Sequence, residues 1–243
     1  MTLTDKFKKK VINYQPDQKA LDRIRQAPIL LTCGITGAGK NAVLNRLRQG
    51  YPDLYHFILS HVTRPKRDYE VQDVHYHFVD FSTIEEMVDE KAFVEVDIVH
   101  TDYVYGTSIA EIERIESANQ IACTDVTIRG VDDYIALDLN IKAVFLLPPS
   151  YEVWKKRLLA RYESAGEMNR RDLRNRLQSA LEEIEHALKT YHFYIVINDD
   201  LEHTAHIVHK IATGEPVEPH YHKAMHIAEE IAGSIKEAIK RLE

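Results

Sequence analysis

The run Gly34-Ile-Thr-Gly-Ala-Gly39-Lys40 constrains the fold of this chain more than any other stretch. It follows an apolar pentapeptide, residues 29–33, that is typical of a buried strand, and an amphipathic helix is predicted directly after it. Glycines let the backbone wrap closely, so that its N–H groups and the dipole of the next helix face phosphate oxygens. The pattern predicts a phosphate loop made of Gly34, Ile35, Thr36, Gly37, Ala38, Gly39, Lys40, Asn41 and Ala42.

The position after the lysine departs from the usual pattern of such loops. Ser or Thr commonly stands there and binds Mg²⁺ through its hydroxyl, whereas this chain has Asn41 followed by Ala42. An Asn carbonyl oxygen can serve as a ligand for a hard cation or hold one of its waters. We therefore keep Asn41 as a candidate metal ligand.

The remaining chain predicts an α/β fold. Apolar strands alternate with amphipathic helices, which is typical of a parallel sheet covered by helices on both faces. Residues 60–106 break this rhythm with short, closely spaced strands and are predicted to form a small mixed insertion. Within and after it, Ser82 and Ser108 are each followed three residues later by Glu, which predicts capping boxes for two helices.

These patterns divide the chain into five predicted parts. The kinase-type core comprises residues 28–59 and 107–213, interrupted by the insertion at 60–106, and a polar stretch at 161–176 is predicted to be a helical lid. Residues 1–27 are predicted to be an extension with at most a short helix near Asp17–Ala27. Residues 214–243 form a helical extension with Ile227, Ile231, Ile235 and Ile239 on one stripe, which either docks on its own core or contacts a second copy.

Composition narrows the classes of partner and compartment. A formal net charge of −7 argues against broad contact with nucleic acid or an anionic membrane, so bound phosphate must be held by local clusters. No apolar run is long enough to cross a bilayer. Cys33 and Cys123 both lie in apolar runs and are expected to be buried free thiols rather than a disulfide. The expected location is the cytoplasm.

A second informative stretch runs from Ser60 to Phe78. It places two arginines, Arg64 and Arg67, near a serine and several tyrosines, a set that can hold one phosphate through charge-assisted hydrogen bonds. Taken alone, the same residues also suit a solvated charged loop.

The order of these motifs resembles the guanylate kinase family. That family carries S-x-x-T-R-x-x-R-x-x-E-x-x-x-x-x-Y-x-F after its phosphate loop, and Ser60 to Phe78 match every specified position. The resemblance extends over about residues 28–213, through Phe93-Val-Glu95, Tyr105-Gly-Thr107 and Asn198-Asp-Asp-Leu201. It implies a P-loop kinase that phosphorylates GMP with ATP and uses Mg²⁺.

The resemblance also implies roles for individual residues. Ser60, Arg64, Arg67, Tyr76 and Tyr105 would hold the GMP phosphate, while Glu70, Glu95 and Thr107 would lie on the guanine side. Asp125, at the end of a strand, would serve the acceptor site and the metal. Asn198 would lie near the ATP base. Lys40 and two arginines that flank the lid, Arg161 and Arg176, would be catalytic by supplying positive charge to the transferred phosphoryl group.

Guanine recognition by Glu95 agrees with elementary chemistry. Guanine presents N1–H and N2–H₂ donors, for which a carboxylate is a natural bidentate acceptor, and adenine lacks that pair. A site built for those donors rejects a base without them, because its own polar groups are left unpaired.

Four departures from the family pattern keep other functions open. Asn41 and Ala42 replace the usual small or hydroxyl residues, and Thr127 stands where a second aspartate is usual. The segment between Glu95 and Tyr105 is one residue longer, and the lid is about four residues longer, with Arg170, Arg171 and Arg174 as further candidates. A kinase with another phosphorylated acceptor and a non-catalytic guanylate-kinase-like binding module are the alternatives. The guanine-side pair Glu70 and Glu95 disfavours the first alternative, and retention of Lys40 disfavours the second.

Overall fold

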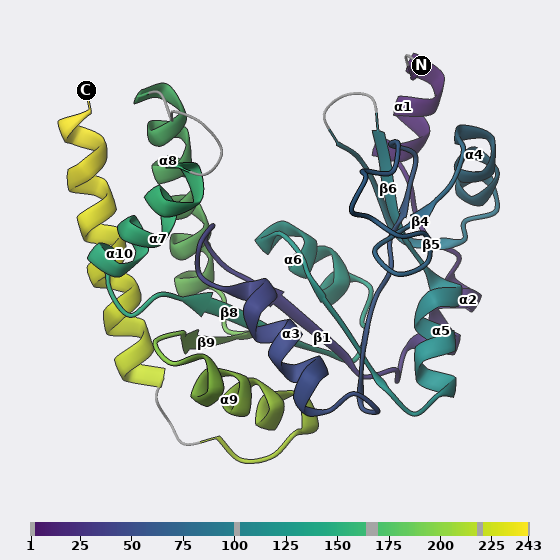
Figure 1. Ribbon diagram of the computed structural model, residues 1–243. Helices are drawn as coiled ribbons and strands as arrows, with labels where there is room; N and C mark the ends of the chain where they lie inside the picture. Colours follow the sequence, from purple (N-terminus) through teal and green to yellow (C-terminus); the bar gives the residue numbers. More distant parts are fainter. Residues whose placement is uncertain (1–2, 100–102, 164–169, 218–220, 243) are drawn as a thin grey trace. The chain divides into compact units, whose positions relative to one another are not determined.

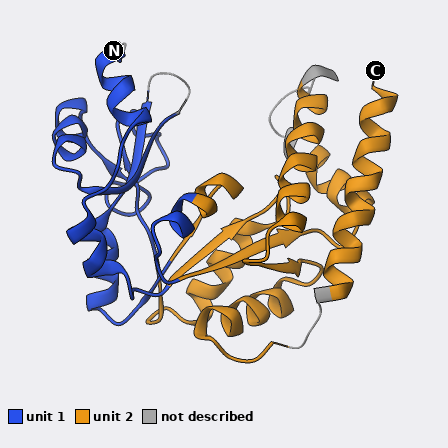
Figure 2. Cartoon of the chain, turned by 180° about the vertical axis from the view of Figure 1, so that it is seen from behind, with its two compact units in different colours: residues 1–28, 56–122, 133–140 blue, residues 29–55, 123–132, 141–243 orange. Residues whose placement is uncertain are grey.

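The computed structural model describes residues 3–99, 103–163, 170–217 and 221–242 (Figure 1). The chain divides into two compact units (Figure 2). The smaller unit comprises residues 1–28, 56–122 and 133–140, and the larger comprises residues 29–55, 123–132 and 141–243.

The main sheet confirms the expected P-loop kinase architecture. Its five strands have the order β2-β7-β1-β8-β9, and both β1–β8 and β8–β9 pair in parallel. All five residues of β1 are buried, as expected for a central parallel strand covered on both faces. The strands are β1 (Ile29–Cys33), β2 (Tyr55–Phe57), β7 (Ile121–Asp125), β8 (Ile141–Leu147) and β9 (Phe193–Ile197).

Helices flank this sheet. In the larger unit α3 packs beside α9, and α10 lies along α8 (Figure 1). Within the described part of the chain, no helix combines the length and apolar character needed to span a membrane. The helices of the larger unit are α3 (Lys40–Gly50), α7 (Tyr151–Glu163), α8 (Arg170–Lys189), α9 (Leu201–Thr213) and α10 (Tyr221–Arg241). Helix α6 (Ile128–Ala136) has residues in both units.

The isoleucine stripe of α10 docks on its own chain. Ile231 and Ile235 are 1% and 0% exposed, and α10 contacts α7, α8 and β9. Of the two expectations for this stripe, packing within the chain is the one observed. The stripe therefore does not require a second copy to cover it.

The smaller unit contains a mixed four-stranded sheet in the order β4-β3-β6-β5. β3 pairs with β4 in parallel and with β6 antiparallel, and β5 and β6 form an antiparallel pair. Two helices accompany the sheet, α4 (Phe81–Asp89) and α5 (Ile109–Ser117). The strands are β3 (His61–Val62), β4 (His77–Phe78), β5 (Phe93–Val99) and β6 (Tyr103–Ser108).

The N-terminal segment has more structure than its polar sequence indicated. It contains two helices, α1 (Asp5–Ile12) and α2 (Gln18–Ile24), where at most one near Asp17–Ala27 was expected. Phe7 of α1 is 1% exposed and packs edge-to-face on Phe81 at 4.7 Å between ring centres. Since Phe7 belongs to the same apolar cluster as Phe93 of β5, α1 contributes to the core of the smaller unit.

Of the two serines predicted to cap helices, Ser108 is confirmed as an N-cap, although the Glu111 carboxylate accepts from the Leu59 amide and Arg114. The Ser108 side chain caps α5 by accepting from the Glu111 amide. At α4 the prediction was wrong, because Asp80 caps the helix by accepting from the Thr83 amide. Ser82 instead donates to the Asp80 carboxylate at 2.8 Å. The N-cap of α4 is therefore Asp80, two residues before the serine that was predicted to cap it.

Candidate functional site

The phosphate loop joins β1 to α3 through glycines that no other residue can replace. Gly34 has a φ of 132°, and a Cβ there would lie 2.3 Å from the Leu146 carbonyl oxygen. Gly39 has a φ of 95°, and its Cβ would lie 2.2 Å from the side-chain nitrogen of Asn198. Both positions combine a left-handed backbone with backbone or side-chain atoms at close approach. The fold therefore explains these two glycines by steric need.

Two side chains donate hydrogen bonds to the backbone of the phosphate loop. The Asn198 side-chain amide, which is buried, donates to the Ala38 carbonyl at 2.7 Å, and the Trp154 indole donates to the Thr36 carbonyl at 2.9 Å. The resemblance implied that Asn198 lies near the ATP base. Trp154 is 1% exposed, and its bond to the loop had no signal in the sequence.

The start of α3 offers an anion site. Gly39 precedes the helix with no side-chain cap, so the first-turn N–H groups remain available to phosphate oxygens. Lys40 begins the helix, and its ammonium donates to the Gly34 carbonyl at 2.6 Å. That bond holds the lysine against the loop, where its charge can serve a bound polyphosphate.

The candidate metal ligands suit a magnesium ion that arrives with a nucleotide. Asn41 lies exposed in the first turn of α3, and Asp125 lies exposed at the end of β7. β7 runs beside β1, as the bond from the Val126 amide to the Thr32 carbonyl at 3.0 Å shows. Mg²⁺ is commonly held by one or two protein oxygens together with phosphates and waters. In the described ranges, no cluster of three or more His, Cys, Asp or Glu residues is placed to hold a metal ion.

Arg64 is the centre of the acceptor-side cluster in the smaller unit. Its two terminal nitrogens donate to the Glu70 carboxylate at 2.6 Å each, and its Nε donates to the Tyr105 hydroxyl at 2.8 Å. The guanidinium carbon lies 4.9 Å from the Tyr76 ring centre. Hydrogen bonds from Arg64 lower the pKa of Glu70 to about 2. The arginine is therefore held in one orientation by a fork-like ion pair and by aromatic faces.

The other residues predicted to hold the GMP phosphate include Arg67, Tyr76, Tyr105 and Ser60. The Arg67 amide donates to Glu70 at 2.8 Å, while its exposed guanidinium donates to the Tyr69 hydroxyl at 2.8 Å. The Tyr76 and Tyr105 rings meet edge-to-face at 6.1 Å. Ser60 lies just before β3, and its carbonyl accepts from the His77 amide at 3.0 Å. Both Glu70 oxygens accept from Arg64, and one of them also accepts from the Arg67 amide.

Glu95 and Thr107 are the two further residues for which the resemblance implied a guanine-side role. They are direct partners across β5 and β6, so their side chains share one face of the small sheet. Burial raises the pKa of Glu95, and hydrogen bonding from Thr107 lowers that pKa in part. A buried carboxylate has lost its hydrogen bonds to water. Donors on a ligand that replace those bonds stabilise its charged form.

The predicted catalytic arginines lie on the lid helices. Arg176 is exposed on α8. Arg161 belongs to α7, and its side chain lies outside the described part of the chain, as do lid residues 164–169. The structure therefore describes Lys40 and Arg176 of the three predicted catalytic side chains.

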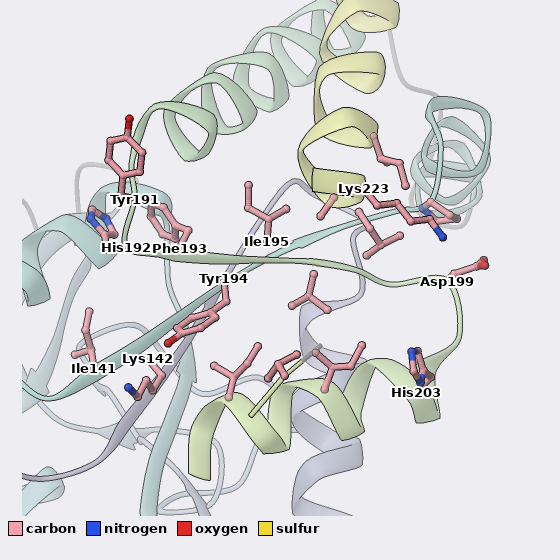
Figure 3. Close-up of a pocket in the computed structure, with 18 residues that line it drawn as sticks. Ile141, Lys142, Tyr191, His192, Phe193, Tyr194, Ile195, Asp199, His203 and Lys223 are labelled. Atoms are coloured by element: carbon pink, nitrogen blue, oxygen red, sulfur yellow. The ribbon is translucent and has the colours of Figure 1, made fainter. Parts of the chain in front are cut away.

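A separate cavity of about 850 Å³ lies beside edge strand β9, between α9 and α10 (Figure 3). Its lining is largely apolar and includes Tyr194, Ile195 and Ile227. It contains none of the predicted site residues.

Comparison with known proteins bears on this geometry. The family model described as guanylate kinase matches residues 25–215. The chain is 36% identical over 170 residues to a guanylate kinase of Schizosaccharomyces pombe, covering 70% of this chain and 82% of that protein. It is 35% identical over 178 residues to guanylate kinase 1 of Oryza sativa subsp. japonica, covering 73% of this chain. The match spans only 45% of the rice protein.

Similar proteins also occur among bacteria and solved structures. The chain is 32% identical over 178 residues to a guanylate kinase of Neisseria gonorrhoeae, covering 73% of this chain and 83% of that protein. Among crystal structures, a guanylate kinase from Anaplasma phagocytophilum aligns with a TM-score of 0.55 at 20% identity. That alignment covers 81% of this chain and 89% of the other. At such identity, the structural likeness concerns the fold alone.

Proposed function

The chain belongs to the guanylate kinase family, and from this membership we propose that it transfers a phosphoryl group from ATP to GMP, giving ADP and GDP. The observation that carries the proposal is the pairing of Arg64 with Glu70 and Tyr105 in a chain that also keeps Lys40 on its phosphate loop. A phosphate loop alone indicates only a polyphosphate nucleotide. The acceptor cluster around Arg64 supports a second, phosphorylated substrate.

On the donor side, we assign ATP to the loop of residues 34–42 and the start of α3. The first-turn amides of α3 bind phosphate oxygens, and Lys40 neutralises the β- and γ-phosphates. Asn198 supports the loop through Ala38, so its contribution to ATP binding is to hold the loop backbone in shape.

On the acceptor side, the GMP phosphate binds to Ser60, Arg64, Arg67, Tyr76 and Tyr105. Glu95 accepts from guanine N1–H and N2–H₂, with Thr107 beside it, and Asp125 serves the acceptor site and the metal as expected from the family. Glu70 orients Arg64 and Arg67. This revised role follows from its hydrogen bonds and differs from the guanine-side role that the resemblance implied.

The chemistry requires little covalent help from the protein. The GMP phosphate is already an anionic nucleophile, so no general base is needed. Rate acceleration comes from aligning the two phosphates and from neutralising charge through Lys40, Arg161 and Arg176. The lid at 161–176 carries two of these charges. Asn41 and Asp125 would hold Mg²⁺, which would supply further charge neutralisation when bound.

The proposal includes a setting for the activity. A net charge of −7 disfavours nucleic acid and anionic membranes as partners. We expect the enzyme to act in the cytoplasm, in purine nucleotide metabolism. Cys33 and Cys123 are both free and buried, as a reducing compartment allows. A homodimer remains part of the proposal, but the α10 stripe does not support it because that stripe is covered within the chain.

An ADP-release assay tests the proposal. The chain is offered GMP, dGMP, AMP, CMP and UMP as acceptors, with ATP as donor, in the presence and absence of Mg²⁺. We expect Mg²⁺-dependent turnover that is highest with the guanine nucleotides. Tight GMP binding without turnover would favour a non-catalytic module. Absence of both GMP binding and turnover would favour a kinase with another phosphorylated acceptor.

A further inference from the structure

The cavity of about 850 Å³ beside β9 follows the open edge of the main sheet. β9 is the last strand in the order of that sheet and pairs with β8 on one side. The cavity is lined by all five residues of β9 and by the two residues before it. Side chains of a strand alternate between the two faces of a sheet, so a cavity on one face would contact every second residue. Contact with consecutive residues therefore places this cavity along the edge of the strand.

Both sides of this edge have an apolar wall. Ile195 points to the side of the strand where α10 lies, and Tyr194 points to the side where α9 lies (Figure 3). Ile227 of α10 lines the first wall, and Ile207 and Ile211 of α9 line the second. A chain segment that lay along β9 would thus have apolar neighbours for both rows of its side chains.

The edge of β9 also carries backbone groups that can still form hydrogen bonds. The Asn198 amide donates to the Leu147 carbonyl of β8 at 2.7 Å, and successive residues of a strand direct their backbone groups to opposite sides. The backbone groups of Phe193 and Ile195 therefore face away from β8. Among the described residues, none outside the β8–β9 pair forms a hydrogen bond with these groups. A peptide main chain can pair with them, whereas a hydrocarbon ligand cannot.

Two lysines give the cavity a positive charge. Lys142 and Lys223 both line it and lie toward its opposite ends (Figure 3). Neither forms an ion pair or hydrogen bond with another residue in the described ranges. Asp199 is the one carboxylate among the described lining residues. An occupant with a negative charge at each end would therefore complement the two lysines.

We propose that this cavity binds an extended peptide segment of a partner protein, which adds to the free edge of β9 as a further strand. The segment has apolar side chains on both of its faces and an acidic residue at each end. Hydrogen bonds between the main chains supply affinity, and the apolar walls and the lysines select the sequence. The wall that α10 provides lies beyond residues 25–215, which the family model matches. The inference is independent of the proposed kinase activity.

The test uses a fluorescein-labelled peptide, Glu-Val-Ile-Val-Tyr-Val-Glu, and measures its binding to the full chain by fluorescence anisotropy. The peptide is made in two forms, each with N-methyl groups on alternate amides, so that one form lacks each row of N–H donors. A strand added at an edge uses only one row of its amides. We therefore expect one form to bind and the other to bind about 10-fold or more weakly.

A charge exchange identifies the cavity as the binding site. The double variant Lys142→Glu/Lys223→Glu should bind the acidic-ended peptide about 10-fold or more weakly than wild type. It should bind the same peptide with Lys at both ends more tightly than wild type does, and this gain shows that the cavity is still folded. Lys156→Glu, at an exposed site on α7 outside the cavity lining, is the control and should change neither affinity.

Four results would overturn the proposal. Equal binding of the two methylated forms would refute strand addition, and so would failure of both forms to bind wild type. Binding of sodium dodecanoate, but of neither peptide, with the same dependence on the two lysines would assign the cavity to a small amphipathic anion. Sedimentation that shows wild-type dimers, lost in the double variant, would assign the edge to a second copy. The ADP-release assay is run separately, so its outcome does not affect this test.

Discussion

Glu70 accepts a hydrogen bond from each terminal nitrogen of Arg64, at 2.6 Å in both cases. The two side chains are 4% and 9% exposed. Glu70 also accepts from the Arg67 amide, so one carboxylate sets the position of two phosphate-side arginines. An arginine that is ordered before a ligand arrives loses little side-chain entropy on binding phosphate.

Replacing Glu70 by Gln should therefore weaken GMP binding. An amide cannot accept two charged donors as a carboxylate does, so Arg64 loses its fixed orientation. We expect the KM for GMP to rise about 10-fold or more, with a smaller change in the KM for ATP. Glu113→Gln removes an exposed ion pair with Arg23 in the same unit and is the control. Equal GMP affinity in both variants would contradict the positioning role of Glu70.

Replacing Asn198 by Asp should disturb the phosphate loop. The change turns a donor that faces the Ala38 carbonyl into a charged acceptor, which leaves that carbonyl unpaired. We expect about 1–3 kcal/mol lower stability in denaturant unfolding and a raised KM for ATP. Asn140→Asp removes a bond of the same kind to the Gln26 carbonyl at an exposed site. If both variants bind ATP alike, Asn198 does not support the loop.

Replacing Lys40 by Ala should lower kcat by about 10²–10³ or more, since it removes a charge directed at the transferred phosphoryl group. The lysine also bonds to the Gly34 carbonyl, so melting must be measured alongside turnover. Near-normal turnover in a folded variant would rule out the assigned role of the phosphate loop.

Glu95 should control both base choice and the acid side of the pH profile. Because burial raises its pKa, the ionised form that guanine needs appears only above the ordinary carboxylate range. The kcat/KM for GMP should therefore rise with pH through this raised pKa. Glu95→Gln should abolish the acid limb and lower the GMP-over-AMP preference about 10²-fold or more. A parallel loss of GMP and AMP turnover would argue against a base-side role.

His61 should make the chain sensitive to acid. Its Nδ1 is buried and without a partner among the described residues, and its ring lies 4.6 Å from that of His77. Burial, and then His77, lower the pKa of His61 to about 4. A histidine whose folded pKa is depressed contributes stability above its unfolded pKa, about 6.5, and loses that contribution as the pH falls toward 4.

His61→Phe should therefore lose less stability than wild type between pH 7 and 5, by about 1 kcal/mol. Urea unfolding at both pH values measures the difference. His226→Phe, at an exposed site on α10, is the control and should follow wild type. A variant with the full acid sensitivity of wild type would show that other groups cause it.

Features that depend on neighbouring residues, such as a buried strand or a helix cap, could be predicted from the sequence pattern. The strand at residues 29–33 occurs as expected, because a continuous apolar run of this length is buried in a sheet that is covered on both faces. The cap at Ser108 was likewise readable from spacing. The cap at α4 was not, since Asp80 and Ser82 both suit that position and only the backbone geometry chose between them.

The sequence by itself determined the phosphate loop, the acceptor motif and the family, because glycines, lysine and paired arginines have few other uses at such spacing. Tertiary structure decided which partner each polar group meets. Glu70 pairs with Arg64, while Asn198 and Trp154 donate to the loop backbone. The physical reason is that hydrogen bonds act over about 3 Å, and residues far apart in the chain come that close only after the sheets and helices have packed.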